Sequence, residues 1–351
     1  MKKFLSVFLF CALISLSALA QRRDSVAVLF LGNSYTEVNN LPRLVQNVAA
    51  SAGKYVYYQA NTPGGANLGN HLTNGSLTFM NNYEWDVCVL QDQSQLPSFP
   101  DGDLRYYHFW ENAAQLVNEF YSRFPEGEVM FYMTWGRKNG DAANAQFFPP
   151  LGTYEGMDSM LFMRYMMLRD SNDASVSPVG RLWHYLRDNN PDIELYSGDE
   201  SHPSLAGSYA AACSFYTMLF EDDPMHITSD EGVDPREADI IRSAAKTVVF
   251  DDISRWWRAS THTNGPDNPE GIAAVAGEAF ALSVYPNPAN EVLNISVSHD
   301  DDVAIYDAQG RLWKRIHVAA GTTRISLSDA PGHLLMVKSE RNMAARMVVV
   351  Q

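Results

Sequence analysis

The stretch VAVLFLGNSYT, residues 26–36, joins an apolar run to a tight polar turn. Residues 26–31 are apolar without interruption, which is typical of a strand buried on both faces of a parallel sheet. Gly32 permits a sharp turn where this strand ends, and Ser34 stands on the turn. The stretch therefore predicts a central strand of an α/β sheet that presents a serine at its carboxyl end.

Strand-like and helix-like segments alternate outward from this stretch, over residues 21–258. Such alternation predicts a three-layer α/β/α domain with a parallel sheet of five strands, flavodoxin-like in arrangement. The expected strands are 26–31, 55–60, 85–90, 128–135 and 193–196. The expected helices are 41–52, 107–124, 203–220 and 235–257.

The two ends of the chain depart from this pattern. Residues 1–20 hold a pair of lysines, an apolar run and an A-x-A site, and predict a signal peptide whose cleavage leaves no integral membrane segment. Residues 259–280 are polar and rich in Gly and Pro, and predict a linker. Residues 281–351 contain short stretches of alternating hydrophobicity and predict a small all-β sandwich.

The composition excludes several classes of partner. The formal net charge is −15, and loss of the two signal-peptide lysines brings it to −17 (−15 − 2). Such a surface repels phosphate backbones, so nucleic acid is not an expected partner. Cys88 and Cys213 lie in apolar surroundings and predict buried thiols. Because the sequence has no C-x-x-C motif or His/Cys cluster, it predicts neither a metal site nor a cofactor.

A second polar turn, DESHP at residues 199–203, follows the last predicted strand. Asp199 and His202 can hydrogen-bond across one turn, so that the carboxylate fixes the imidazole tautomer. Each turn by itself also fits an ordinary role, since Asp199 can simply cap a helix. Because both turns stand at strand ends, where α/β sheets bind ligands, they together predict a triad of Ser34, His202 and Asp199.

The two turns resemble the first and last sequence blocks of the SGNH (GDSL-like) hydrolases, and the resemblance covers about residues 25–222. It implies an ester hydrolase in which Ser34 is the nucleophile. Residues 63–67, PGGAN, are placed like the second block of that family. By this resemblance Gly65, with Gly64 as the alternative, donates its N–H to the oxyanion hole together with the N–H of Ser34.

The third block departs from the family pattern. Where the family has G-x-N-D, this chain has Gln91-Asp92-Gln93-Ser94. By offset, Gln93 replaces the oxyanion-binding asparagine, and Gln91 is the alternative donor. A similar block occurs in the branch that resembles carbohydrate acetylesterases, so the resemblance implies an O-acetyl group on a carbohydrate as the substrate.

Residues 134–139, TWGRKN, follow the fourth predicted strand and are expected to overhang the same cleft. Trp135 is expected to stack on a sugar ring, and Arg137 to bind a carboxylate or a hydroxyl. In the alternative interpretation, Trp135 is buried and Arg137 is solvated or pairs with Asp141.

The tail carries its own resemblance. The segments YPNPA (285–289), IYDAQGR (305–311) and VVVQ (348–351) resemble the C-terminal sorting domain of type IX secretion. This implies contact with the type IX machinery and a location outside the cell or on its surface. Two other functions stay open: a lipase or thioesterase with the same triad, and a non-catalytic carbohydrate-binding pseudoenzyme.

Overall fold

The computed structural model describes residues 23–258, 282–285, 289–307, 312–332, 334–339 and 345–350. The chain divides into two compact units, Met1–Thr263 and Asn264–Gln351, and the division falls inside the predicted linker. The predicted signal peptide (1–20) and the whole predicted linker (259–280) lie outside the described residues.

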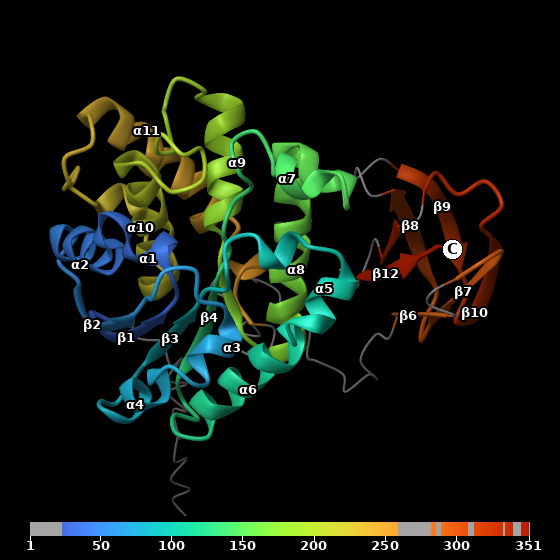
Figure 1. The fold of residues 1–351 in the computed structure, drawn as a ribbon, viewed down its shortest axis with the longest axis horizontal. Coiled ribbons are helices and arrows are strands. Elements are labelled where there is room, and N and C mark those ends of the chain that lie inside the picture. Colours follow the sequence, from blue (N-terminus) through green and yellow to red (C-terminus); the bar gives the residue numbers. More distant parts are fainter. Residues whose placement is uncertain are drawn as a thin grey trace, which may run out of the picture. The chain divides into compact units, whose positions relative to one another are not determined.

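The larger unit is built on a parallel sheet of five strands in the order β2-β1-β3-β4-β5 (Figure 1). The strands are β1 (Ser25–Leu31), β2 (Tyr55–Asn61), β3 (Val87–Leu90), β4 (Glu128–Tyr132) and β5 (Ser175–Ser177). The predicted fold class is confirmed. Strand β1 is buried from Val26 to Leu31, because helices cover both faces of the sheet.

The strand order changes direction between β1 and β3, which are neighbours in register, with Leu31 opposite Leu90. Chain segments that follow these two strands therefore leave the sheet side by side at its carboxyl edge. Such a switch point is where open α/β sheets bind ligands.

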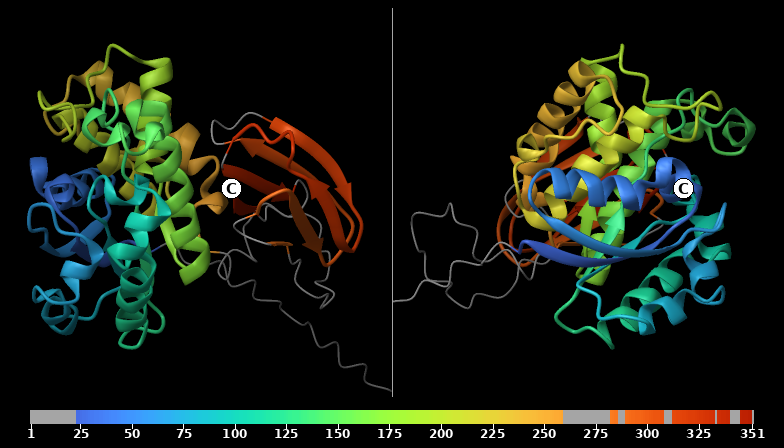
Figure 2. Two further views of the ribbon diagram at one scale, coloured as in Figure 1. Left: turned by 45° about the vertical axis from the view of Figure 1, so that its right-hand side comes forward. Right: turned by 90° about the vertical axis from the view of Figure 1, so that its left-hand side faces the viewer.

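Helices flank the sheet in two layers (Figure 2). Helices α2 and α10 pack against each other on one face, and α6 and α8 lie on the other. Helix α10 is buried from Ala206 to Phe220, since its side chains are apolar or small all round. The helices are α1 (Ser34–Glu37), α2 (Leu41–Ser51), α3 (Leu68–His71), α4 (Ser76–Asn81), α5 (Asp101–Tyr106), α6 (Phe109–Tyr121), α7 (Ala142–Ala145), α8 (Tyr154–Asn172), α9 (Val179–Asn189), α10 (Leu205–Phe220) and α11 (Pro235–Ala245).

The fifth strand is not the predicted one. The sheet uses β5, whereas residues 193–196 pair with no strand and form only a bridge between Tyr196 and Pro203. Strand β5 escapes an apolar search because two of its three residues are serines. Both serine hydroxyls are hydrogen-bonded to buried partners, so polar residues are tolerated inside the sheet.

Two other elements end earlier than predicted. The expected strand 128–135 stops at Tyr132, and the expected helix 235–257 stops at Ala245. A π turn, Lys246–Phe250, and a 3-10 turn, Ile253–Arg255, replace its last part.

The smaller unit contains two antiparallel sheets, β10-β7-β6 and β12-β11-β8-β9. Side chains from both sheets, including Ile295, Ile305 and Val337, form one apolar core, as expected of the predicted sandwich. The strands are β6 (Leu282–Tyr285), β7 (Val292–Val297), β8 (Asp301–Asp307), β9 (Leu312–Val318), β10 (Gly321–Ser326), β11 (Leu334–Ser339) and β12 (Ala345–Val349).

Candidate active site

The turn after β1 presents Ser34 at the start of α1. Gly32 is required there, because a Cβ at this position would lie 2.5 Å from Thr36 Oγ1 and 2.7 Å from Gln91 Oε1. Asn33 caps α1, accepting a hydrogen bond from Tyr35 N through its Oδ1 at 3.1 Å. Within residues 23–258, the N–H of Ser34 makes no hydrogen bond, as expected of the first residue of a helix.

Ser34 is connected to the two other predicted triad residues. His202 Nε2 lies 2.8 Å from Ser34 Oγ, and His202 Nδ1 lies 2.5 Å from Asp199 Oδ2. Asp199 Oδ1 also accepts hydrogen bonds from the backbone N–H groups of Ser201 and His202, at 3.1 and 2.9 Å. The three side chains thus form one continuous chain at the carboxyl edge of the sheet.

Hydrogen bonds keep Asp199 ionised. Partial burial raises its pKa, but the imidazole of His202 and the two backbone N–H groups outweigh that effect and hold the pKa below its usual value. The side chains of Asp199 and His202 are 49% and 34% exposed, so solvent reaches both.

Backbone contacts within the DESHP loop fix the position of His202. Ser197 N donates to His202 O at 2.8 Å, and Glu200 N donates to Ser197 O at 2.9 Å. Glu200 takes a left-handed conformation, with φ of 60°. Its carbonyl accepts a hydrogen bond from Lys138 N at 2.9 Å, which ties the loop to the segment after β4.

Asn39 fixes the same loop from the side of the Ser34 turn. Its Nδ2 lies 3.0 Å from Ser204 O and 2.9 Å from Ser208 Oγ, immediately after the DESHP segment. Nothing in the sequence alone pointed to Asn39. In the structure, Asn39 takes a left-handed φ of 57°, a conformation that asparagine adopts more readily than most residues.

Asn33 and Gln91 form a buried pair that joins the ends of β1 and β3. Gln91 Oε1 accepts from Asn33 N at 3.1 Å and from Thr36 Oγ1 at 2.6 Å. Gln91 Nε2 donates to Asn33 Oδ1 at 2.7 Å and to Asp92 O at 3.1 Å. Because its amide is fully used inside the protein, Gln91 is a structural link, and the geometry favours Gln93 as the amide donor.

The side-chain NH2 group of Gln93, unlike that of Gln91, has hydrogens that the protein leaves largely unused. Its Oε1 accepts from Gln95 N at 2.8 Å and from Leu96 N at 2.9 Å, which fixes the side chain. Its Nε2 makes only one long contact within residues 23–258, 3.4 Å to Gln95 Oε1. The amide hydrogens of Gln93 are therefore available to a ligand.

Gly65 lies in a turn fastened to the turn that carries Ser34. Ala66 N donates to Pro63 O at 3.1 Å, and Gly65 takes φ of 70°, which favours glycine. Asn33 Nδ2 donates to Ala66 O at 2.9 Å. Among the residues from 23 to 258, no acceptor is bonded to the N–H of Gly65 or of Gly64.

Asp92 and His71 are buried groups that the sequence did not single out. Asp92 Oδ1 accepts from Leu68 N at 3.0 Å and from Gln93 N at 2.7 Å, and so joins the Gly65 segment to the Gln93 segment. Burial raises the pKa of Asp92 to about 7, although these two bonds oppose the shift. His71 Nε2 donates to Gly32 O at 3.0 Å, and burial lowers its pKa to about 4, so it supports the turn as a neutral ring.

Trp135 is buried, which contradicts the predicted stacking on a sugar ring. It lies in a column of rings instead. The ring centroids of Tyr35 and Trp135 are 4.7 Å apart and their planes are inclined by 4°. Trp183 stacks on Trp135 as well, with a centroid distance of 3.7 Å and an interplanar angle of 8°. The ring of His202 meets Tyr35 edge-on at 5.3 Å. Trp135 Nε1 donates to Ser201 O at 3.1 Å, so the column of rings helps to hold the DESHP loop in place.

Arg137 lies at the border of the site. Its Nη1 is 3.5 Å from Asp141 Oδ1, in a side chain 32% exposed. Burial raises the pKa of Tyr35, whereas hydrogen bonds with Ser201 and Ser94 and the charge of Arg137 lower it, which places Arg137 within electrostatic reach of the Tyr35 hydroxyl. Arg137 thus pairs with Asp141 and stays partly exposed.

Within the described ranges, no cluster of three or more side chains is suited to a metal ion. The described helices also include none that is long and apolar enough to cross a membrane. Cys88 and Cys213 are buried free thiols, as predicted, and burial raises the pKa of both.

Residues 283–350 match the family described as the secretion system C-terminal sorting domain. The C-terminal unit is a type IX sorting domain. The match indicates export to the cell surface or the extracellular space, and it implies contact with the secretion machinery. No curated protein matches the chain.

The larger unit resembles solved structures. A DUF4886 family protein from Bacteroides uniformis matches with 18% identity over 64% of this chain and 94% of its own, at a TM-score of 0.55. A protein from Slackia heliotrinireducens described as a candidate SGNH hydrolase matches with 25% identity over 55% of this chain and 97% of its own, at a TM-score of 0.45. A mutant acetyl-xylooligosaccharide esterase from Geobacillus Stearmophilus matches with 12% identity over 58% of this chain and 97% of its own, at a TM-score of 0.41. The first of these likenesses shows the fold.

Proposed function

We propose that the larger unit is a secreted serine esterase of the SGNH type. The observation that carries the proposal is the continuous chain of hydrogen bonds from Ser34 Oγ through His202 to Asp199. A nucleophile, a base and an orienting carboxylate within hydrogen-bond reach are the parts that acyl transfer needs. In this account, the sorting domain delivers the enzyme to its substrate outside the cell.

In the first half-reaction, Ser34 Oγ bonds to the ester carbonyl carbon as its proton passes to His202 Nε2. The carbonyl π electrons move to the oxygen, which becomes an oxyanion. When the tetrahedral intermediate collapses, the C–O bond to the alcohol breaks and His202 gives its proton to the leaving alkoxide. Water then repeats the sequence on the acyl-enzyme, which releases the acid and restores Ser34. Asp199 stabilises the imidazolium throughout.

The oxyanion is assigned to the N–H groups of Ser34 and Gly65 and the amide of Gln93. Support comes from their free hydrogens and from the bonds that fasten their three segments together through Asn33 and Asp92. Donors held in place before the reaction stabilise the charge without reorganisation.

The proposed substrate is an O-acetyl ester of a carbohydrate. The side chains next to the triad are polar: Tyr35 is hydrogen-bonded to Ser201, with Ser94 close by. Such surroundings favour a short acyl group and a hydroxylated alcohol over the long acyl chain of a lipase or thioesterase substrate. Arg137 is assigned to a hydroxyl or a carboxylate of the sugar.

Hydrolysis of 4-nitrophenyl acetate by the mature protein tests the proposal, beside the Ser34→Ala variant. We expect turnover by the first protein and none above background by the second. Equal rates would contradict the triad. A panel of 4-nitrophenyl esters from acetate to decanoate tests the acyl group, and a preference for decanoate would favour the lipase. Absence of turnover with every ester would favour the non-catalytic alternative.

A further inference from the structure

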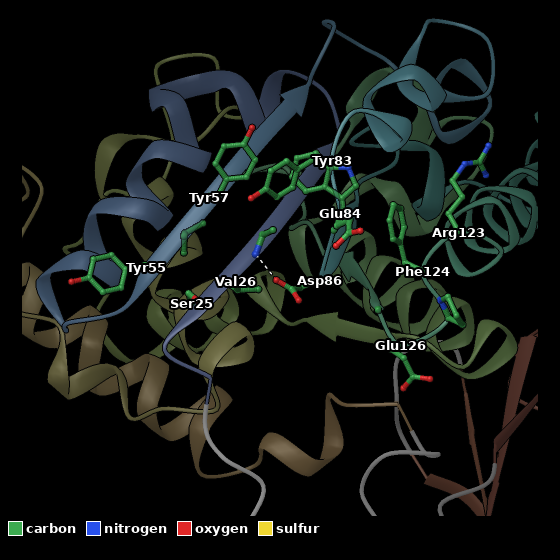
Figure 3. A pocket seen from close by; sticks show the side chains of 15 residues that line it. Ser25, Val26, Tyr55, Tyr57, Tyr83, Glu84, Asp86, Arg123, Phe124 and Glu126 are labelled. Carbon is green, nitrogen blue, oxygen red and sulfur yellow. Dashed lines mark hydrogen bonds between the residues drawn. The ribbon is translucent and has the colours of Figure 1, made fainter.

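A hollow of about 980 Å³ lies at the edge of the sheet opposite the triad (Figure 3). The first residues of β1 and β2, the segment before β3 and the connection from α6 to β4 line it. Because the strands are parallel, their amino ends gather here and their carboxyl ends gather at the triad. The hollow is therefore separate from the proposed active site, and its volume is within the range of about 300–1,000 Å³ that small-ligand sites occupy.

Three aromatic rings form one wall of the hollow. Tyr57 and Tyr83 lie 4.4 Å apart between ring centroids, and Trp85 lies 5.8 Å from Tyr57 and 5.2 Å from Tyr83. Trp85 is 3% exposed and donates its Nε1–H to Phe79 O at 3.1 Å, so it forms a fixed base. Tyr57 and Tyr83 are 43% and 47% exposed. Contiguous exposed rings of this kind mark a binding surface.

The polar groups of the hollow are mainly acceptors. Glu84, Asp86 and Glu126 are exposed carboxylates, and Figure 3 shows Glu84 and Asp86 beside the ring cluster. Asp86 Oδ2 accepts from Ala27 N at 2.7 Å, whereas Glu84 and Glu126 have no hydrogen bond or ion pair within the described residues. The one cationic side chain of the lining, Arg123, is already bonded to Glu119 and Asn81.

We propose that this hollow binds a neutral oligosaccharide. A pyranose ring has an apolar face of C–H groups, which the rings of Tyr57 and Tyr83 can cover, and hydroxyl donors at its edge, which the carboxylates can accept. The carboxylates disfavour a phosphorylated or sulfated ligand. They also disfavour a purely apolar one, which would leave them buried without partners. The site holds a glycan while the opposite edge of the sheet stays open.

Affinity electrophoresis of the full mature chain through gels that contain soluble xylan, galactomannan or mixed-linkage β-glucan tests the proposal. All proteins carry Ser34→Ala, so the result does not depend on ester hydrolysis. We expect at least one neutral glycan to retard the chain, and the Tyr57→Ala/Tyr83→Ala variant to bind about tenfold more weakly or worse. Tyr106→Ala is the matched control, since Tyr106 is 76% exposed on α5 outside the hollow.

Glu84→Gln/Glu126→Gln serves as a second variant that keeps the rings, and it is expected to weaken retardation as well. Melting curves show whether each variant is folded. Retardation that is equal with and without the two tyrosines would overturn the proposal. Retardation by dextran sulfate alone, or by no neutral glycan, would overturn it too.

Discussion

The two edges of the sheet use the same kinds of side chain in opposite ways. At the carboxyl edge, Tyr35 is 1% exposed, its hydroxyl is bonded to Ser201 and its ring is stacked on Trp135. At the amino edge, Tyr57 is 43% exposed. Catalysis needs groups fixed to fractions of an ångström, which buried networks provide. Recognition of a sugar face needs rings that are open to solvent.

The comparison predicts that substitutions at the carboxyl edge change rate and stability, whereas those at the amino edge change mainly glycan binding. The largest effect is expected in the triad. Asp199→Asn replaces the carboxylate beside His202 with a neutral amide that favours the wrong imidazole tautomer, and should lower kcat by about 10⁴, whereas His202→Ala should lower it by about 10⁶. Rates on 4-nitrophenyl acetate measure both, with Tyr55→Ala as the amino-edge control. An Asp199→Asn variant with more than a tenth of normal activity would contradict the role of Asp199.

The second expected effect is on stability. Trp135→Ala removes a buried ring from the column under the DESHP loop and should reduce the free energy of unfolding by about 3–5 kcal/mol. Tyr57→Ala removes a half-exposed ring and should cost about 1 kcal/mol or less. Urea unfolding of the two variants measures the difference, and similar losses would remove the contrast between the edges.

At the carboxyl edge, Gln91 is expected to affect stability and Gln93 to affect the rate. Gln91→Ala removes the buried acceptor of Asn33 N and of Thr36 Oγ1 and should cost about 1–3 kcal/mol of unfolding free energy. Gln93→Ala should leave stability nearly unchanged and lower kcat by roughly 10²–10³, with a smaller change in KM. Steady-state kinetics and urea unfolding of both variants test this. A rate loss confined to Gln91→Ala would reverse the assignment.

A pH dependence of stability is expected from Asp92. Burial raises its pKa to about 7 in the folded chain, whereas the unfolded carboxyl has its ordinary pKa near 4. Between these values the folded state keeps a proton that the unfolded state loses, so stability falls as the pH rises. Asp92→Asn cannot titrate. Its unfolding free energy relative to the unsubstituted protein should therefore gain on the order of 2 kcal/mol from pH 5 to pH 8. An unchanged difference across this range would contradict the burial of the carboxyl.

The sequence predicted much of the carboxyl edge and nothing of the amino edge. Ser34, Asp199 and His202 stand in short motifs at the ends of chain segments, so their meeting followed from a parallel sheet. Trp135 was placed wrongly because a residue that follows a strand can enter the core or the cleft, and only the stack with Tyr35 and Trp183 decides between them.

Other residues act through contacts that join distant segments. Asn39 meets a loop 165 residues away, and Asp92 is held by Leu68. Strand β5 was missed because its hydroxyls are satisfied by partners that are remote in the sequence. Tyr57 and Tyr83 come together only through the pairing of β1 with β2 and β3. No local pattern contains these relations.

Reaction with a fluorophosphonate tests the central claim most directly. If Ser34 is the activated nucleophile, the mature protein should gain the mass of one phosphonyl group, and peptide mapping should place it on Ser34. Ser34→Ala should gain none, and His202→Ala should react far more slowly. An adduct on another residue, or none on the folded protein, would contradict the account.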